Sequence, residues 1–387
     1  MKTPAEFDEI RPYDPEDLQG IYDELMEDES FLAVVQAIMP GALSRGKEGL
    51  RAMLGHCTTN LDFQRTFIYP MIEKIVSEKS TSTTLDATSL TDREQPYVYI
   101  SNHRDIVLDS ALLCMLLIRS GFKDTVEIAI GDNLLAYPWI RKIVRINKAF
   151  IVQRSLSMRE MLASSKRMSE YMQYALTQKR QSIWIAQREG RAKDSDDRTQ
   201  EALIKMMLMG GEGDILEKLK RLHIVPLSIS YEYDPCDFLK AQEFQMKRDV
   251  EGFKKSKQDD LINMQTGIYG FKGQIHYHMA PCINPWLDNL EGLPKAEILA
   301  QVVQHIDHEI HANYRIFANN YIALDMLEHT DHSDHYTPEQ RLHFEKYLQE
   351  RLQMIRVPQG SDDDFLMERM LTMYANPLRN HLKATES

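Results

Sequence analysis

A histidine at the end of a short apolar run is the feature of this sequence with the clearest chemical potential. His103 follows a β-branched and aromatic run at residues 97–101, and Asp105 and Asp109 come within the next six residues. A carboxylate that accepts a hydrogen bond from one imidazole nitrogen fixes the tautomer and leaves the other nitrogen free as a base. The pattern predicts a general base, and the alternative is a hydrogen-bonded surface histidine.

Arginines follow two further apolar runs. Arg154 comes just after residues 149–152, and Arg188 and Arg191 come just after residues 182–186. A guanidinium group binds phosphate through two parallel hydrogen bonds. If these runs are strands that end at the same sheet edge as the histidine, the arginines converge on one anionic group. Separate surface salt bridges are the alternative.

The elements that must position these side chains alternate in type. Helical patterns at residues 106–119, 134–144, 157–177 and 199–209 lie between short strand-like runs at residues 98–101, 125–130, 149–152, 182–186 and 224–230. Such alternation is typical of an α/β sheet with helices on its faces. We predict a mixed sheet with helices on both faces, flanked by N- and C-terminal helical segments. Alternating residues at 267–283 predict a hairpin at the sheet edge.

Three segments follow from these patterns. Residues 1–92 are expected to form an N-terminal helical segment with a polar linker, because residues 77–96 contain few large apolar side chains and Pro70 interrupts a helical pattern. Residues 93–293 form the predicted α/β domain. Residues 294–387 form a C-terminal helical segment with a capping box starting at Thr337.

Four ordered blocks within residues 97–230 resemble the glycerolipid acyltransferase family, which includes glycerol-3-phosphate and lysophosphatidic acid acyltransferases. They are a His-Asp block, a Phe-Ile strand ending in Arg, a Glu-Gly-Arg turn, and a strand with Val225-Pro226. The resemblance implies that His103 is the general base, that Asp109 orients it, and that the acceptor is bound by Arg154, Glu189, Gly190 and Arg191.

The chain departs from the family pattern in three places. Five residues separate His103 from Asp109 instead of four, so Asp105 is a possible substitute partner. Lys148 stands where a glycine is common, and residues 189–191 lack the spacer before the arginine. The identity of the orienting carboxylate and the details of the phosphate contact therefore stay open.

The resemblance implies transfer of a fatty acyl group from acyl-CoA or acyl carrier protein to the hydroxyl of glycerol-3-phosphate or lysophosphatidic acid in phospholipid synthesis. No cofactor or metal is expected. Two alternatives are O-acylation of a lyso-aminolipid or another lysolipid, and a non-catalytic lipid-binding protein that keeps the fold. No G-x-S-x-G motif occurs, so a serine acyl-enzyme is not suggested.

Composition limits the remaining function classes. The net charge of −12 argues against nucleic acid as a partner, because duplex affinity comes mainly from neutralising phosphates. The four cysteines are far apart and predict reduced thiols. Neither a signal peptide nor a run of about 20 apolar residues is present. We therefore expect a cytoplasmic protein that binds the inner face of the membrane peripherally.

Two further patterns bear on partners. Residues 133–156 combine basic, aliphatic and aromatic side chains without Asp or Glu, which suits an anionic membrane surface, although a helix packed on the sheet with a solvated basic face is an equal alternative. His305, His308 and His311, and a second group at residues 329–335, are potential metal ligands. Their spacing matches no known metal site, and we expect them to be solvated.

Overall fold

The computed structural model describes residues 2–135, 137–154 and 156–386, and within them a single sheet has seven strands. The strand order is β1-β7-β6-β2-β5-β3-β4, and all neighbours are parallel except β6 and β7. This mixed α/β sheet confirms the predicted fold class. The strands are β1 Ser82–Asp86, β2 Val98–Ser101, β3 Val126–Gly131, β4 Ala149–Val152, β5 Ser182–Ala186, β6 Ile224–Tyr231 and β7 Gln274–Met279.

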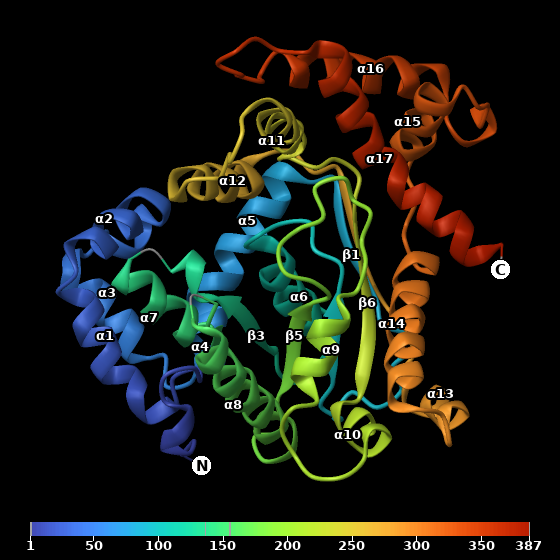
Figure 1. Ribbon diagram of the computed structural model, residues 1–387. Helices are drawn as coiled ribbons and strands as arrows, with labels where there is room; N and C mark the ends of the chain where they lie inside the picture. Colours follow the sequence, from blue (N-terminus) through green and yellow to red (C-terminus); the bar gives the residue numbers. More distant parts are fainter. Residues whose placement is uncertain (1, 136, 155, 387) are drawn as a thin grey trace.

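Helices cover both faces of the sheet, as the strand–helix alternation predicts (Figure 1). One face packs against α5 (Tyr69–Lys79) and α6 (Leu108–Arg119). The other packs against α8 (Met158–Thr177), α9 (Glu201–Met207), α10 (Ile215–Leu222), α13 (Asn284–Leu287) and α14 (Lys295–Ala312). Each central strand is thus buried on two sides, which explains why residues of β2 and β6 are almost all apolar.

The N-terminal helices form a separate core beside α7 (Pro138–Ile146). They are α1 (Leu18–Met26), α2 (Glu29–Ile38), α3 (Gly46–Gly55) and α4 (Asn60–Phe63). Between α4 and α5 the helix passes through a π-turn, Gln64–Ile68, just before Pro70. The predicted interruption at this proline is confirmed, because its ring nitrogen has no hydrogen to donate.

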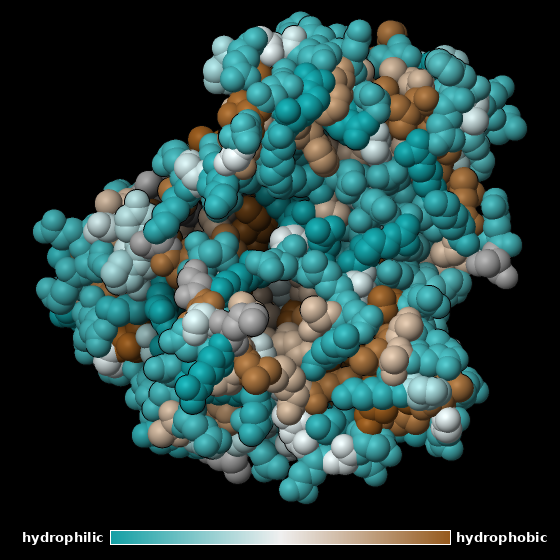
Figure 2. Space-filling model, viewed as in Figure 1, coloured by the Kyte–Doolittle hydropathy of each residue, from teal (hydrophilic) through white to brown (hydrophobic). Residues whose placement is uncertain are grey.

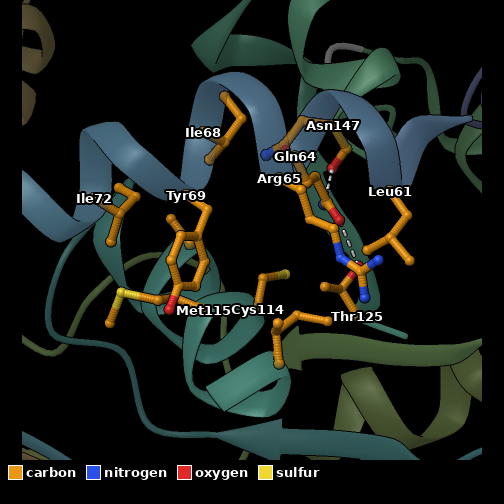
Figure 3. Close-up of a pocket in the computed structure, with 12 residues that line it drawn as sticks. Leu61, Gln64, Arg65, Ile68, Tyr69, Ile72, Cys114, Met115, Thr125 and Asn147 are labelled. Atoms are coloured by element: carbon orange, nitrogen blue, oxygen red, sulfur yellow. Dashed lines mark hydrogen bonds between the residues drawn. The ribbon is translucent and has the colours of Figure 1, made fainter. Parts of the chain in front are cut away.

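The π-turn also fastens these helices to the sheet domain. Figure 3 shows Gln64 between two partners: its side chain donates to the Asn147 carbonyl at 3.4 Å and accepts from the Thr125 hydroxyl at 2.6 Å. Beside these contacts, side chains such as Ile68 and Met115 line a cavity of only about 20 Å³. The interface between α5 and α6 is therefore closely packed.

The C-terminal segment has its own core, formed with α11 (Asp237–Asp249). Its helices are α15 (Ala318–Glu328), α16 (Pro338–Leu352) and α17 (Asp363–Thr385), and Thr337 caps α16 through the predicted capping box. In Figure 1 they lie above the sheet, next to α11, and α12 (Lys257–Tyr269) lies on the other side of α11.

Two predicted elements are wrong. Residues 77–96 are not only a linker, because β1 lies within them and pairs with β7. Residues 267–283 are not a hairpin: α12 ends at Tyr269, and β7 is a single strand that runs antiparallel to β6. β1 is rich in Ser and Thr, so its edge pairing has little hydrophobic signal in the sequence.

Candidate active site

The carboxyl ends of four neighbouring strands create the site. The strands β2, β5, β3 and β4 are parallel and adjacent, so the residues that follow them emerge at one edge of the sheet. Asn102, the first residue after β2, fixes the direction of the chain there. Its side chain donates to the Ile229 carbonyl at 2.9 Å and accepts from the Ile229 N–H at 2.8 Å, which ties the turn to β6.

His103 contacts a carboxylate directly. Its Nδ1 lies 2.8 Å from Oδ2 of Asp109, which is fully buried in the first turn of α6. The same oxygen accepts the N–H groups of Arg104 at 2.6 Å and Asp105 at 3.0 Å. Because Oδ2 of Asp109 already accepts two backbone N–H groups, it also acts as the acceptor in its contact with His103. The arrangement therefore favours the proton on Nδ1 of the imidazole.

Asp105 has a different environment. Its Oδ1 accepts the N–H groups of Val107 at 2.9 Å and Leu108 at 2.7 Å, which caps the start of α6. Burial and the nearby charge of Asp109 raise the pKa of Asp105. Of the two carboxylates left open by the sequence, Asp109 is the one placed against the imidazole.

His103 lines a pocket of about 510 Å³ at this sheet edge. Trp184 of β5 forms part of the wall, with its ring 5.8 Å from the imidazole in an edge-to-face arrangement. The predicted residues that follow β4 and β5 also line it. The charged side chains of the lining are Arg154, Arg188, Glu189, Arg191, Lys193, Lys255 and Asp260. Five cations against two carboxylates make this a site suited to anions, in a chain of net charge −12.

The predicted acceptor residues are brought together around this pocket. Nη1 of Arg154 lies 3.2 Å from Oε1 of the exposed Glu189. Gly190 has φ 68°, a left-handed conformation that favours glycine and turns the chain between Glu189 and Arg191. Arg191 donates through Nη2 to Oδ1 of Asn263 on α12 at 3.0 Å, and its buried Nη1 has no hydrogen-bond partner among the described residues.

Sequence reasoning missed three of the polar residues around the site. Lys193 comes from the loop after the Glu-Gly-Arg turn, Lys255 from the loop before α12, and Asn263 from α12. No motif identifies them, because they reach the pocket through tertiary packing. Burial lowers the pKa of Lys193 to about 8, although its ion pair with Glu243 opposes that shift.

A second, more apolar groove of about 280 Å³ continues from the pocket. The two share a wall that includes Gly131, Arg154 and Ala186. Beyond that wall the groove runs between α8 and α9 over the ends of β3, β4 and β5, where its apolar lining consists of Val152, Met161, Met168, Ile185, Leu203 and Met206. A polar, cationic pocket therefore opens into a groove whose apolar side chains alternate with polar ones such as Gln153 and Ser164.

The basic stretch at residues 133–156 is largely occupied by contacts within the protein. Arg145 of α7 is buried and donates to the carbonyls of Asp8 at 2.6 Å and Arg11 at 2.8 Å. Lys142 pairs with Glu24 at 2.7 Å, and Trp139 packs near Phe31. α7 thus packs against the N-terminal helices, and these basic side chains form contacts within the protein instead of a free membrane-binding face or a fully solvated one.

The histidine groups differ from the expectation in part. His311 is buried, with Nε2 2.8 Å from the Asp197 carbonyl, and His305 stacks on Trp286. His332 contacts Asp325, whereas His308 is exposed. In the described part of the chain no three His, Cys, Asp or Glu side chains are grouped as a metal site.

Figure 2 shows a mostly hydrophilic face with apolar side chains in a hollow beside α12. A groove of about 260 Å³ between α5 and α12 accounts for this hollow, with Met71, Ile72, Ile75, Ile268 and Tyr269 among its lining. Among residues 2–135, 137–154 and 156–386, no helix has the length and hydrophobicity needed to cross a bilayer.

Comparison with known proteins finds a match to a family model over part of the chain. Residues 76–230 match the family model described as Acyltransferase, a range that contains every predicted site residue. No curated protein matches the sequence. Among solved structures, the crystal structure of the 1-acyl-sn-glycerophosphate (LPA) acyltransferase PlsC from Thermotoga maritima is similar with a TM-score of 0.37 and 11% identity, covering 76% of this chain and 96% of that one. So low a TM-score supports no argument about this chain.

Proposed function

We propose that this chain, whose residues 76–230 match the family model described as Acyltransferase, transfers a fatty acyl group from acyl-CoA or acyl carrier protein to a glycerol-phosphate-type hydroxyl, that of glycerol-3-phosphate or lysophosphatidic acid, in phospholipid synthesis. The observation that carries this proposal is the contact between His103 and Asp109 inside a pocket lined by five cations.

His103 acts as the general base in this proposal. With Nδ1 donating to Asp109, Nε2 accepts the proton of the acceptor hydroxyl as its oxygen attacks the thioester carbonyl. The carbon–sulfur bond breaks, and the imidazolium returns the proton to the leaving thiolate. Asp109 stabilises the imidazolium, as the carboxylate of a serine-protease triad does.

The phosphate of the acceptor binds at the cationic side of the pocket. Arg154 and Arg191 supply guanidinium groups, and the unpartnered Nη1 of Arg191 gives a buried donor for an anionic oxygen. Glu189 keeps Arg154 in place, and Gly190 allows the turn that brings Arg191 to the pocket. The anion is thus bound by guanidinium groups that follow β4 and β5.

The fatty acyl chain lies in the groove between α8 and α9. A thioester carbonyl near His103 would place the chain along the wall shared by the two cavities, with methionines on both sides. Methionine side chains are flexible and adapt to hydrocarbon. Met161, which lines this groove, and its neighbour Leu162 on α8 are exposed, with exposed fractions of 46% and 64%, and together give a surface suited to the inner face of the membrane.

The test is an acyl-transfer assay with radiolabelled acyl-CoA and acyl carrier protein donors and a panel of acceptors, comparing the wild type with His103→Ala. Loss of the general base is expected to reduce the rate by about 10²–10⁴-fold while the fold is kept. Acylation of a lyso-aminolipid alone would change the acceptor assignment. Lipid binding without any transfer would favour a non-catalytic protein, and near-normal turnover of His103→Ala would refute the catalytic role.

A further inference from the structure

A buried ion pair lies directly behind the proposed catalytic pair. The side chain of Arg104 turns away from the pocket, and its Nη2 lies 2.6 Å from Oδ2 of Asp197. The exposed fractions of the two side chains are 7% and 1%. The Tyr314 hydroxyl donates to the same Asp197 oxygen at 2.7 Å, and the Tyr314 ring faces the guanidinium at 5.7 Å. Breaking such a buried pair leaves an uncompensated charge in the interior.

The backbone of Arg104 connects this ion pair to the proposed catalytic pair. Its N–H donates to Oδ2 of Asp109 at 2.6 Å, on the oxygen that contacts His103. The guanidinium of Arg104 is held by Asp197, and its backbone N–H binds the carboxylate of Asp109. A shift of Arg104 would therefore move Asp109 relative to the imidazole.

The loop that carries Asp197 is itself fastened by the C-terminal helices. His311 of α14 contacts the Asp197 carbonyl at 2.8 Å. Asn376 and Asn380 of α17 donate to the Asp194 carbonyl at 2.8 Å and to Asp196 at 3.1 Å. The position of Asp197 is thus set by helices that lie far outside the block containing His103.

We propose that Arg104 and Asp197, supported by Tyr314, are positioning residues for the pair formed by His103 and Asp109. Through the Arg104 N–H they fix the position of the Asp109 carboxylate. The C-terminal helices contribute by holding the loop that carries Asp197 in place. This role rests on the proposed function, because it is defined by the base that it positions.

The experiment compares Tyr314→Phe, Asp197→Asn and Arg104→Lys with the wild type. Misplacement of the base is expected to lower kcat by about 10²-fold in Asp197→Asn, with less effect in Tyr314→Phe and with the KM of both substrates unchanged. Arg104→Lys keeps the positive charge. It should therefore retain more activity than a fourth variant, Arg104→Met, which removes that charge. The control is Lys205→Ala, which removes an exposed side chain of α9 that pairs with Glu201 and should leave kcat unchanged.

A second readout needs no substrate. The Nδ1–H proton of His103, hydrogen-bonded to Asp109, is expected to give a low-field proton resonance in the wild type that shifts or disappears in Asp197→Asn and Tyr314→Phe. If the wild type transfers no acyl group, the proposed function fails, but this resonance still tests the positioning. Should Asp197→Asn fail to fold, Tyr314→Phe carries the test. Wild-type kcat and an unchanged resonance in the folded variants would overturn the inference.

Discussion

At the scale of single residues, one carboxylate oxygen organises the site. Oδ2 of Asp109 binds His103 and two backbone N–H groups, all from the turn between β2 and α6. The five-residue spacing allows this because the chain folds back over the N-terminus of α6, where a negative charge is favoured by the helix dipole. The contact is made across a turn and does not depend on two side chains sharing a helix face.

Separate substitutions of the two carboxylates test this arrangement. Asp109→Asn keeps the shape but cannot stabilise the imidazolium, and we expect kcat to fall by about 10²-fold or more. Asp105→Asn should reduce stability through its capping bonds and leave the kcat of the folded protein within a few-fold. Steady-state kinetics on both variants, with unfolding curves to correct for the folded fraction, decide the matter. A larger kcat loss in Asp105→Asn would assign the orienting role to that residue.

Lys193 predicts a pH dependence for anion binding. Its pKa of about 8 means that it is charged below pH 8 and becomes neutral above it. Its charged neighbours are Glu243, Lys247 and Lys255. Loss of the positive charge of Lys193 itself weakens the attraction of the pocket for a phosphate. We expect the KM of a phosphate-bearing substrate to rise about five-fold between pH 7 and pH 9, since one weak ion pair contributes about 1 kcal/mol.

The matched control is Lys193→Arg, which stays charged over that range and should flatten the profile. The KM is measured at each pH with the second substrate saturating. The same rise in the arginine variant would exclude Lys193 as its origin.

Sequence reasoning could place His103, Arg154 and Arg191 because each follows an apolar strand, and parallel strands end together. It could not find Asp197 or Asn263. Both lie outside any strand end and reach the site only after the C-terminal helices and α12 have packed. Such contacts between residues distant in sequence leave no local pattern.

At the scale of elements, α12 is the helix that closes over the turn containing His103. Asn263 contacts Arg191, and Gly267 faces Asp105 so closely that a Cβ there would overlap the carboxylate. The sequence signal for this helix is weak because its apolar residues do not follow one stripe. For that reason its C-terminal end is mistaken for the first strand of a hairpin. β7 then pairs with β1, whose polar residues resemble a linker.

Gly267→Ala tests the close packing of α12. The added methyl group must displace either the helix or Asp105, so we expect a loss of about 1–3 kcal/mol of stability together with reduced acyl transfer. The free energy of unfolding in urea and the transfer rate are measured on the same preparation. Gly20→Ala in α1 is the control, because a Cβ there meets nothing within 4 Å and alanine favours a helix. Equal stability of both variants would show that α12 can shift to accommodate the added methyl group.

At the scale of the whole molecule, stability is divided among four cores. Two lie on the faces of the sheet, one joins the N-terminal helices to α7, and one joins α11 to α15, α16 and α17. The last is secured by Asp237, which accepts from Tyr347 at 2.7 Å, Tyr374 at 2.8 Å and Arg351 at 2.6 Å. Separate cores allow regions to open independently. The boundaries at residues 92 and 293 remain a prediction.

Acid should open the C-terminal core first, through Asp325. This carboxylate accepts from Thr330, Tyr336 and the His332 N–H, each at 2.8 Å, and contacts Nδ1 of His332 at 2.5 Å. Burial alone would raise the pKa of Asp325, but these hydrogen bonds lower it to about 2. A carboxyl whose pKa is lowered on folding stabilises the protein above its unfolded pKa. That stabilisation, about 2 kcal/mol here, is lost as the pH falls from about 4 to 2.

Hydrogen exchange and limited proteolysis of the loop between α15 and α16, between pH 5 and pH 2, measure this opening. In the wild type, protection of the loop should fall at a higher pH than protection of β2 and β6, because these strands belong to other cores. Asp325→Asn should show the acid-like loss already at pH 7, since the amide cannot replace a charged acceptor for four donors. Asp334→Asn changes an exposed carboxylate in the same loop and should behave as the wild type. Simultaneous loss of protection in the loop and in the strands would mean that the C-terminal helices unfold only together with the sheet. Their contacts with the Asp197 loop would then be kept until the whole protein unfolds.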